Sequence, residues 1–300
     1  MMTITRNALA ATLVLAIGSL SGTGMAADTD KLSTDTHAVI IPAATSPSAP
    51  RSFMQSLMDR TAPSIVTVSF TIRMKMNFGA EMGGGEPQEM HHEINGVLVQ
   101  DGIVVVSLTQ LNGPAGMFAG MMAGQGMQME IVPSEFLVVF PDGTELSAEL
   151  KAKDSDLDLA FIQLTGPRRE DFTVSPLDLS VTGAEPEAGD EVILVNRFSR
   201  ELNYEPICFT TRVSGVIRNP RTLLAIMNTS DAFGSFTASP AFNAEGKLVG
   251  IVTFRPSPDN GSVLPTGRGA QPNMNAMMNA IRLFILPVAD LVRAVEKAKS

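Results

Sequence analysis

The stretch from Asn228 to Ile251, NTSDAFGSFTASPAFNAEGKLVGI, decides the fold of this chain. It begins as a loop of small residues and passes through Pro240 to a turn at Glu245-Gly246. The turn leads into Val249-Gly250-Ile251, an apolar run that predicts a β-strand. Thr237 lies at the centre of the loop and is the first candidate for a functional side chain.

Two upstream segments also combine turn residues with apolar runs, as residues 228–251 do. Residues 96–111 contain an apolar run, a turn at Gly102 and a second apolar run that ends in Thr109-Gln110-Leu111. Residues 140–162 open with the turn Pro141-Asp142-Gly143 and place Asp158 directly before another apolar run. Short apolar runs separated by turn residues predict a protein made mostly of β-strands.

In their order and spacing, these three segments resemble the trypsin-like serine proteases, most closely the bacterial HtrA-type branch. That family carries G-x-I-L-T-N-A-H-V-V, then D-x-x-x-D-L-A-L-L, then G-N-S-G-G-P-L before an acidic-Gly turn and V-x-G-I. The resemblance covers roughly residues 52 to 300. It implies an all-β fold of two six-stranded Greek-key barrels with short helices at the two ends.

The resemblance also assigns the positions of a catalytic triad. The general-base histidine falls on Thr109, the acid on Asp158 and the nucleophilic serine on Thr237. A triad needs a hydroxyl, an imidazole that removes its proton and a carboxylate that orients the imidazole. Ser235 takes the place of an oxyanion-hole glycine, where a side chain restricts the backbone. Only the carboxylate matches the family, so we predict that the chain is catalytically inactive.

Asp158 is then expected to persist as a structural acid that caps or hydrogen-bonds its own turn. The chain has three histidines, His37, His91 and His92, and none of them falls on the base position. The alternative is an active enzyme, either a divergent serine-type endopeptidase or a hydrolase that uses Thr237 with a base from outside the three motifs.

The N-terminal segment predicts export. Residues 1–26 combine Arg6, an apolar run over residues 8–20 and small residues before position 27, as in a signal peptide. Residues 27–50 are rich in Thr, Ser, Ala and Pro and predict a flexible linker. The single cysteine, Cys208, excludes an internal disulfide. We therefore expect a periplasmic or secreted bacterial protein.

The remaining residues, 51–300, are predicted to form one trypsin-like domain. We expect an N-terminal barrel over about residues 64–165, a C-terminal barrel over about 172–256 and a C-terminal helix over about 287–298. No PDZ domain is expected after that helix. A net charge of −9 without any basic run argues against nucleic acid as a partner. We also expect no membrane span after signal cleavage, and an oligomer is compatible with the sequence.

Methionine is unusually frequent, with 18 residues, many of them in Gly-, Asn- or Pro-rich segments that we interpret as loops. Flexible methionines can form an adaptable apolar surface, which is the favoured interpretation and implies no cofactor. Thioethers beside a histidine pair can also bind Cu(I), which makes Met90, His91 and His92 candidate ligands. A copper-binding protein with Met-rich loops is therefore a second alternative function. The first choice remains a pseudoprotease that binds a peptide or protein partner in its vestigial cleft.

Overall fold

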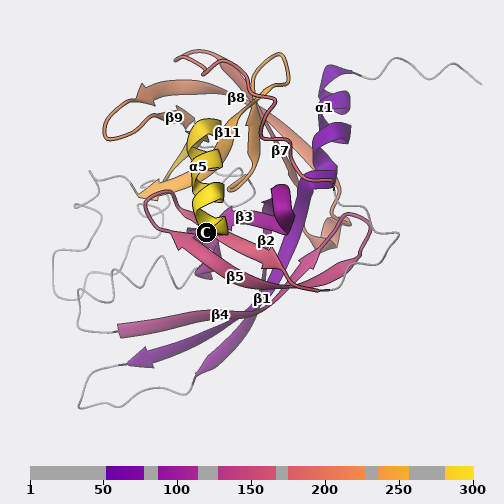
Figure 1. Ribbon diagram of the computed structural model, residues 1–300, viewed down its shortest axis with the longest axis vertical. Coiled ribbons are helices and arrows are strands. Elements are labelled where there is room, and N and C mark those ends of the chain that lie inside the picture. Colours follow the sequence, from indigo (N-terminus) through magenta and orange to yellow (C-terminus); the bar gives the residue numbers. More distant parts are fainter. Residues whose placement is uncertain (1–51, 78–86, 114–127, 167–174, 227–235, 257–280) are drawn as a thin grey trace, which may run out of the picture. The chain divides into compact units, whose positions relative to one another are not determined.

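The computed structural model describes residues 52–77, 87–113, 128–166, 175–226, 236–256 and 281–300. The chain divides into two parts, residues 1–48 and 49–300, and all described residues belong to the second part. Their strands form two closed barrels of six antiparallel strands each (Figure 1). The fold predicted from the sequence, an all-β protein with two six-stranded barrels and short helices at the ends, is confirmed.

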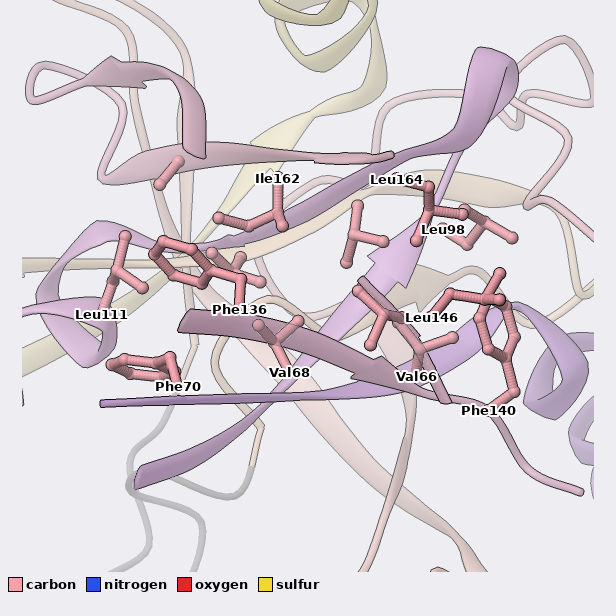
Figure 2. Close-up of a cluster of buried hydrophobic side chains, with 14 of the residues drawn as sticks. Val66, Val68, Phe70, Leu98, Leu111, Phe136, Phe140, Leu146, Ile162 and Leu164 are labelled. Carbon is pink, nitrogen blue, oxygen red and sulfur yellow. The ribbon is translucent and has the colours of Figure 1, made fainter. Parts of the chain in front are cut away.

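The first barrel is closed in the order β1-β2-β3-β6-β5-β4. The strands are β1 (Ile65–Asn77), β2 (Gln88–Leu98), β3 (Ile103–Ser107), β4 (Gln128–Val139), β5 (Glu145–Asp154) and β6 (Leu159–Leu164). Alternate residues of β1 point inward, since Val66, Val68 and Phe70 are all buried in one cluster. Figure 2 shows these side chains together with buried residues of β4 and β6, such as Phe136 and Ile162.

The second barrel is closed in the order β10-β11-β12-β9-β8-β7. The strands are β7 (Glu191–Arg197), β8 (Pro206–Ile217), β9 (Leu223–Ile226), β10 (Pro240–Phe242), β11 (Leu248–Pro256) and β12 (Ile281–Pro287). The predicted end of this barrel near residue 256 is therefore wrong. β12 completes the barrel by pairing with both β11 and β9, although 24 residues of sequence separate it from β11.

Short helices flank the strands. They are α1 (Phe53–Thr61), η1 (Ala62–Ser64), η2 (Gln100–Gly102), α2 (Leu108–Leu111), η3 (Arg200–Leu202) and α5 (Val288–Lys299). Helix α1 begins at Ser52, whose side chain accepts a hydrogen bond from the Gln55 N–H, and it buries Leu57. Helix α5 follows Pro287 and buries Leu291 and Val295. Both helices therefore present an apolar face to the strands.

A separate buried cluster lies where the two barrels meet. It combines Val105 of β3 and Phe161 of β6 with Ile251 of β11 and Leu286 of β12, and α5 adds Val295. Side chains that point out of one barrel are thus buried against the other. This packing holds the first barrel, which carries Thr109 and Asp158, against the second barrel, which carries Thr237.

Gly250 marks a close approach within the second barrel. A Cβ atom at this position would lie 2.1 Å from the carbonyl oxygen of Leu286 on β12. Real Cβ atoms do not approach a backbone oxygen so closely, so only glycine fits here. The requirement explains the glycine of the Val249-Gly250-Ile251 run.

Candidate functional site

Asp158 lies at the turn between β5 and β6, and its side chain is only 6% exposed. Its backbone φ is +58°, in the left-handed region that few residues other than glycine adopt. The preceding turn is fixed by Asp154, whose Oδ1 accepts hydrogen bonds from the N–H groups of Asp156 and Leu157. The turn therefore holds Asp158 in an unusual backbone conformation that brings its carboxylate to α2.

The Asp158 carboxylate is anchored at both oxygens. The N–H of Thr109 donates to Oδ1 at 2.8 Å, and the Ser107 hydroxyl donates to Oδ2 at 2.8 Å. The Thr109 side chain also acts on the carboxylate, since it lowers the pKa of Asp158. Ser107 in turn accepts a bond from the Gln110 N–H at 3.2 Å, which caps α2. The side chain of Asp158 thus fixes the start of the helix that carries Thr109.

The same carboxylate reaches the second barrel. The N–H of Phe254 on β11 donates to Asp158 Oδ2 at 3.1 Å. Burial raises the pKa of Asp158, while the hydrogen bonds from Thr109, Ser107 and Phe254 oppose that shift. The buried side chain of Asp158 therefore links the two barrels by accepting hydrogen bonds from both of them.

Thr237 lies in a short loop that enters β10. Phe236 before it is buried and packs against Phe209 with ring centroids 5.4 Å apart. Ala238 after it has φ +62° and donates its N–H to Val252 O at 2.8 Å. Thr237 itself is only 3% exposed. The loop is therefore anchored on both sides of Thr237, by an apolar contact before it and a backbone hydrogen bond after it.

A buried polar network continues from this loop. Asn196 on β7 donates from Nδ2 to the Ser239 hydroxyl at 2.7 Å, and its Oδ1 accepts the Arg197 N–H at 2.8 Å. The Arg197 guanidinium donates to Ala62 O from both Nε and Nη2, and to Tyr204 O from Nη1. Burial lowers the pKa of Arg197. These bonds tie the loop of Thr237 to β7 and to the segment after α1.

The family model of the trypsin-like peptidase domain matches residues 100–251, which include Thr109, Asp158 and Thr237. The chain belongs to this family. Among solved structures, it is similar to the MamO protease domain from Magnetospirillum magneticum in its apo form. That match has 17% sequence identity and a TM-score of 0.42, and it covers 78% of this chain and 97% of the other. No curated protein sequence matches the chain significantly.

In this trypsin-like peptidase domain, the structure brings together two of the three residues that the sequence predicts as triad positions. Thr109 and Asp158 are hydrogen-bonded to each other. Within the described residues, no hydrogen bond links Thr237 to either of them. Ser235, predicted for the oxyanion-hole position, lies outside the described residues. The residues predicted for the base and the acid are thus in contact, and the predicted base position carries a hydroxyl.

The candidate metal ligands of this trypsin-like domain, Met90, His91 and His92, lie on β2. The Nδ1 atom of His91 is 3.1 Å from Thr71 Oγ1. The His92 ring stacks on Phe70 with centroids 6.1 Å apart, and burial lowers the pKa of His92. His37 lies outside the described residues. Neither histidine of β2 is among the hydrogen-bond partners of Asp158.

Sequence reasoning missed three contributors to the site: Ser107, Phe254 and Asn196. Ser107 could have been found, since Ser107 and Gln110 have the S-x-x-Q spacing of a capping box. Phe254 contributes only a backbone N–H, which no side-chain pattern can reveal.

Across the described residues, the structure has no helix long and apolar enough to cross a membrane.

Proposed function

We propose that this trypsin-like domain is an exported, catalytically inactive pseudoprotease that binds a peptide or protein partner. The observation that carries the proposal is the set of partners of Asp158. Its carboxylate is bound by Thr109, Ser107 and Phe254, and a threonine occupies the position from which a histidine would serve Thr237.

Threonine cannot replace the histidine chemically. A general base must take a proton near neutral pH, and a neutral hydroxyl lacks the pKa for that role. The backbone N–H of Thr109 donates to Asp158 Oδ1, and the side chain of Thr109 carries only this neutral hydroxyl. Thr109 therefore cannot remove the proton of the Thr237 hydroxyl, and Thr237 is not activated as a nucleophile.

The environment of Thr237 supports the same proposal. A nucleophile must be reachable by the carbonyl group it attacks, and Thr237 is 3% exposed. The anchors at Phe236 and Ala238 hold it in this buried place. The barrels themselves remain complete, and such a scaffold can bind an extended peptide through backbone groups without a nucleophile.

Export is proposed from residues 1–26, whose basic residue, apolar run and small residues are typical of a signal peptide. Expression of the full chain in a Gram-negative host, followed by fractionation and N-terminal sequencing, tests this part. We expect a periplasmic product that begins near residue 27. A cytosolic product with an intact N-terminus would contradict the proposal.

Inactivity is tested with the mature chain, unfolded casein and a fluorophosphonate probe, with Thr237→Ala as the matched control. We expect no cleavage and no labelling by either protein. Turnover or labelling that disappears in Thr237→Ala would establish the alternative, an enzyme that uses Thr237 with another base. Activity that persists in Thr237→Ala would point to a contaminant.

Partner binding is tested by selecting peptides from a displayed library against the mature chain. Arg255 follows Phe254 and donates a hydrogen bond to Asp156 O, beside the triad positions. We expect Arg255→Glu to weaken selected peptides and Arg293→Glu, on the exposed side of α5, to leave them unchanged. Failure to select any peptide, or equal losses in both variants, would refute binding at this site.

A further inference from the structure

One buried polar atom on β2 takes no part in the hydrogen bonding of the fold or in the proposed function. The Nε2 atom of His92 is buried and has no hydrogen-bond partner. A buried imidazole nitrogen without a partner carries a desolvation cost. Nitrogens of this kind are also the commonest protein ligands for transition metals.

The register of the sheet decides which side chains accompany His92. His92 pairs with Phe70 of β1, and Met90 pairs with Ile72. Paired residues share a face of the sheet, and so do residues two apart on one strand. Met90 and His92 therefore lie on the face of the buried Phe70 and Ile72, while His91 lies on the opposite face and contacts Thr71.

The Nε2 atom of His92 lies near the backbone of Gly113. A Cβ atom built on Gly113 would lie 2.8 Å from Ile72 Cδ1 and 3.8 Å from His92 Nε2, so both atoms approach the same backbone. Ile72 is the cross-strand partner of Met90. The unpartnered nitrogen thus lies near Gly113 and near Ile72, the residue of β1 that pairs with Met90.

Thioether sulfur complements this nitrogen. Met90 is 36% exposed at the edge of the face, and Met74 lies diagonally across from it on β1. Residues two apart on a strand are roughly 6.6 Å apart at Cα, a span that the three rotatable bonds of methionine can close onto one ion. Soft thioether ligands favour soft ions such as Cu(I).

We propose that His92 Nε2 and Met90 Sδ form a binding site for Cu(I) on this face of β2, with Met74 as an additional sulfur ligand. The site is independent of the vestigial triad. It differs from the sequence-based candidate set because the strand alternation removes His91 from it. It also departs from the interpretation of the methionines as apolar surface alone, since Met90 shares a face of β2 with a histidine whose Nε2 has no partner.

The test is an anaerobic Cu(I) titration of the mature chain in competition with a chromophoric Cu(I) chelator. We expect one ion per chain with the wild type. Met90→Leu and His92→Gln should each lower the affinity by at least about tenfold, because each removes a ligand rather than an outer contact. His91→Gln is the matched control and should leave the affinity within about twofold.

X-ray absorption identifies the copper ligands directly, so that a loss of affinity in a variant is not mistaken for a loss of folding. X-ray absorption of the loaded wild type should show nitrogen and sulfur neighbours of the copper, and sulfur should decrease in Met90→Leu. Circular dichroism must show that both variants are folded. The proposal is overturned if the wild type does not bind, if Met90→Leu and His92→Gln both bind as tightly as the wild type, or if His91→Gln causes the same loss.

Discussion

Replacing Asp158 by alanine removes the acceptor for donors from both barrels. The N–H groups of Thr109 and Phe254 then lose this acceptor. A buried donor without a partner costs about 1–3 kcal/mol, so two donors give about 2–6 kcal/mol. The substitution also removes a carboxylate whose burial is unfavourable, as its raised pKa indicates. We therefore expect a net loss of about 2–4 kcal/mol in the free energy of unfolding.

The assay is urea unfolding at pH 7 followed by circular dichroism, with thermal melting in parallel. For a domain of this size, the expected loss corresponds to a decrease in Tm of roughly 5–15 °C. Asp156→Ala is the matched control, since Asp156 is an exposed acid in the same turn. It should change the free energy by less than about 0.5 kcal/mol.

The change of this stability loss with pH is a second, independent prediction. The folded-state pKa of Asp158 lies above its ordinary value of 3.8. Its contribution to stability is therefore fully present below pH 3.8 and is lost as the pH rises through the folded-state pKa. The cost of Asp158→Ala should thus be larger near pH 4 than at pH 7. A cost under about 1 kcal/mol at both pH values would refute the role of Asp158 as the link between the barrels.

Two further substitutions test the second barrel. Gly250→Ala should destabilise the fold by at least about 3 kcal/mol in urea unfolding, because its Cβ would collide with the β11–β12 pairing, whereas Gly215→Ala meets no atom within 4 Å and should be nearly neutral. Equal stabilities of the two variants would contradict this packing. Arg197→Lys should cost about 2 kcal/mol in the same measurement, since an ammonium group cannot reach both Ala62 O and Tyr204 O. A Tm equal to that of the wild type would show that these bonds contribute nothing.

Much of the fold follows from local patterns in the sequence. The alternation in β1 and the turns around Asp142 and Gly246 predict strands that the structure contains. The membership of β12 in the second barrel was missed, because its neighbours β9 and β11 are far away in sequence. Pairing between distant strands depends on the closure of the whole barrel rather than on any local signal.

Some features of the candidate site likewise follow from the sequence, and others only from the tertiary structure. The sequence alone determined that threonine stands at positions 109 and 237 and aspartate at position 158, because residue identity sets the chemistry that is available. Only the tertiary structure decided that the carboxylate of Asp158 meets Phe254, 96 residues further along the chain. It also decided that His92, rather than His91, shares a face with Met90. Both outcomes depend on strand register and barrel packing, which arise from contacts between distant segments and leave no mark in a local pattern.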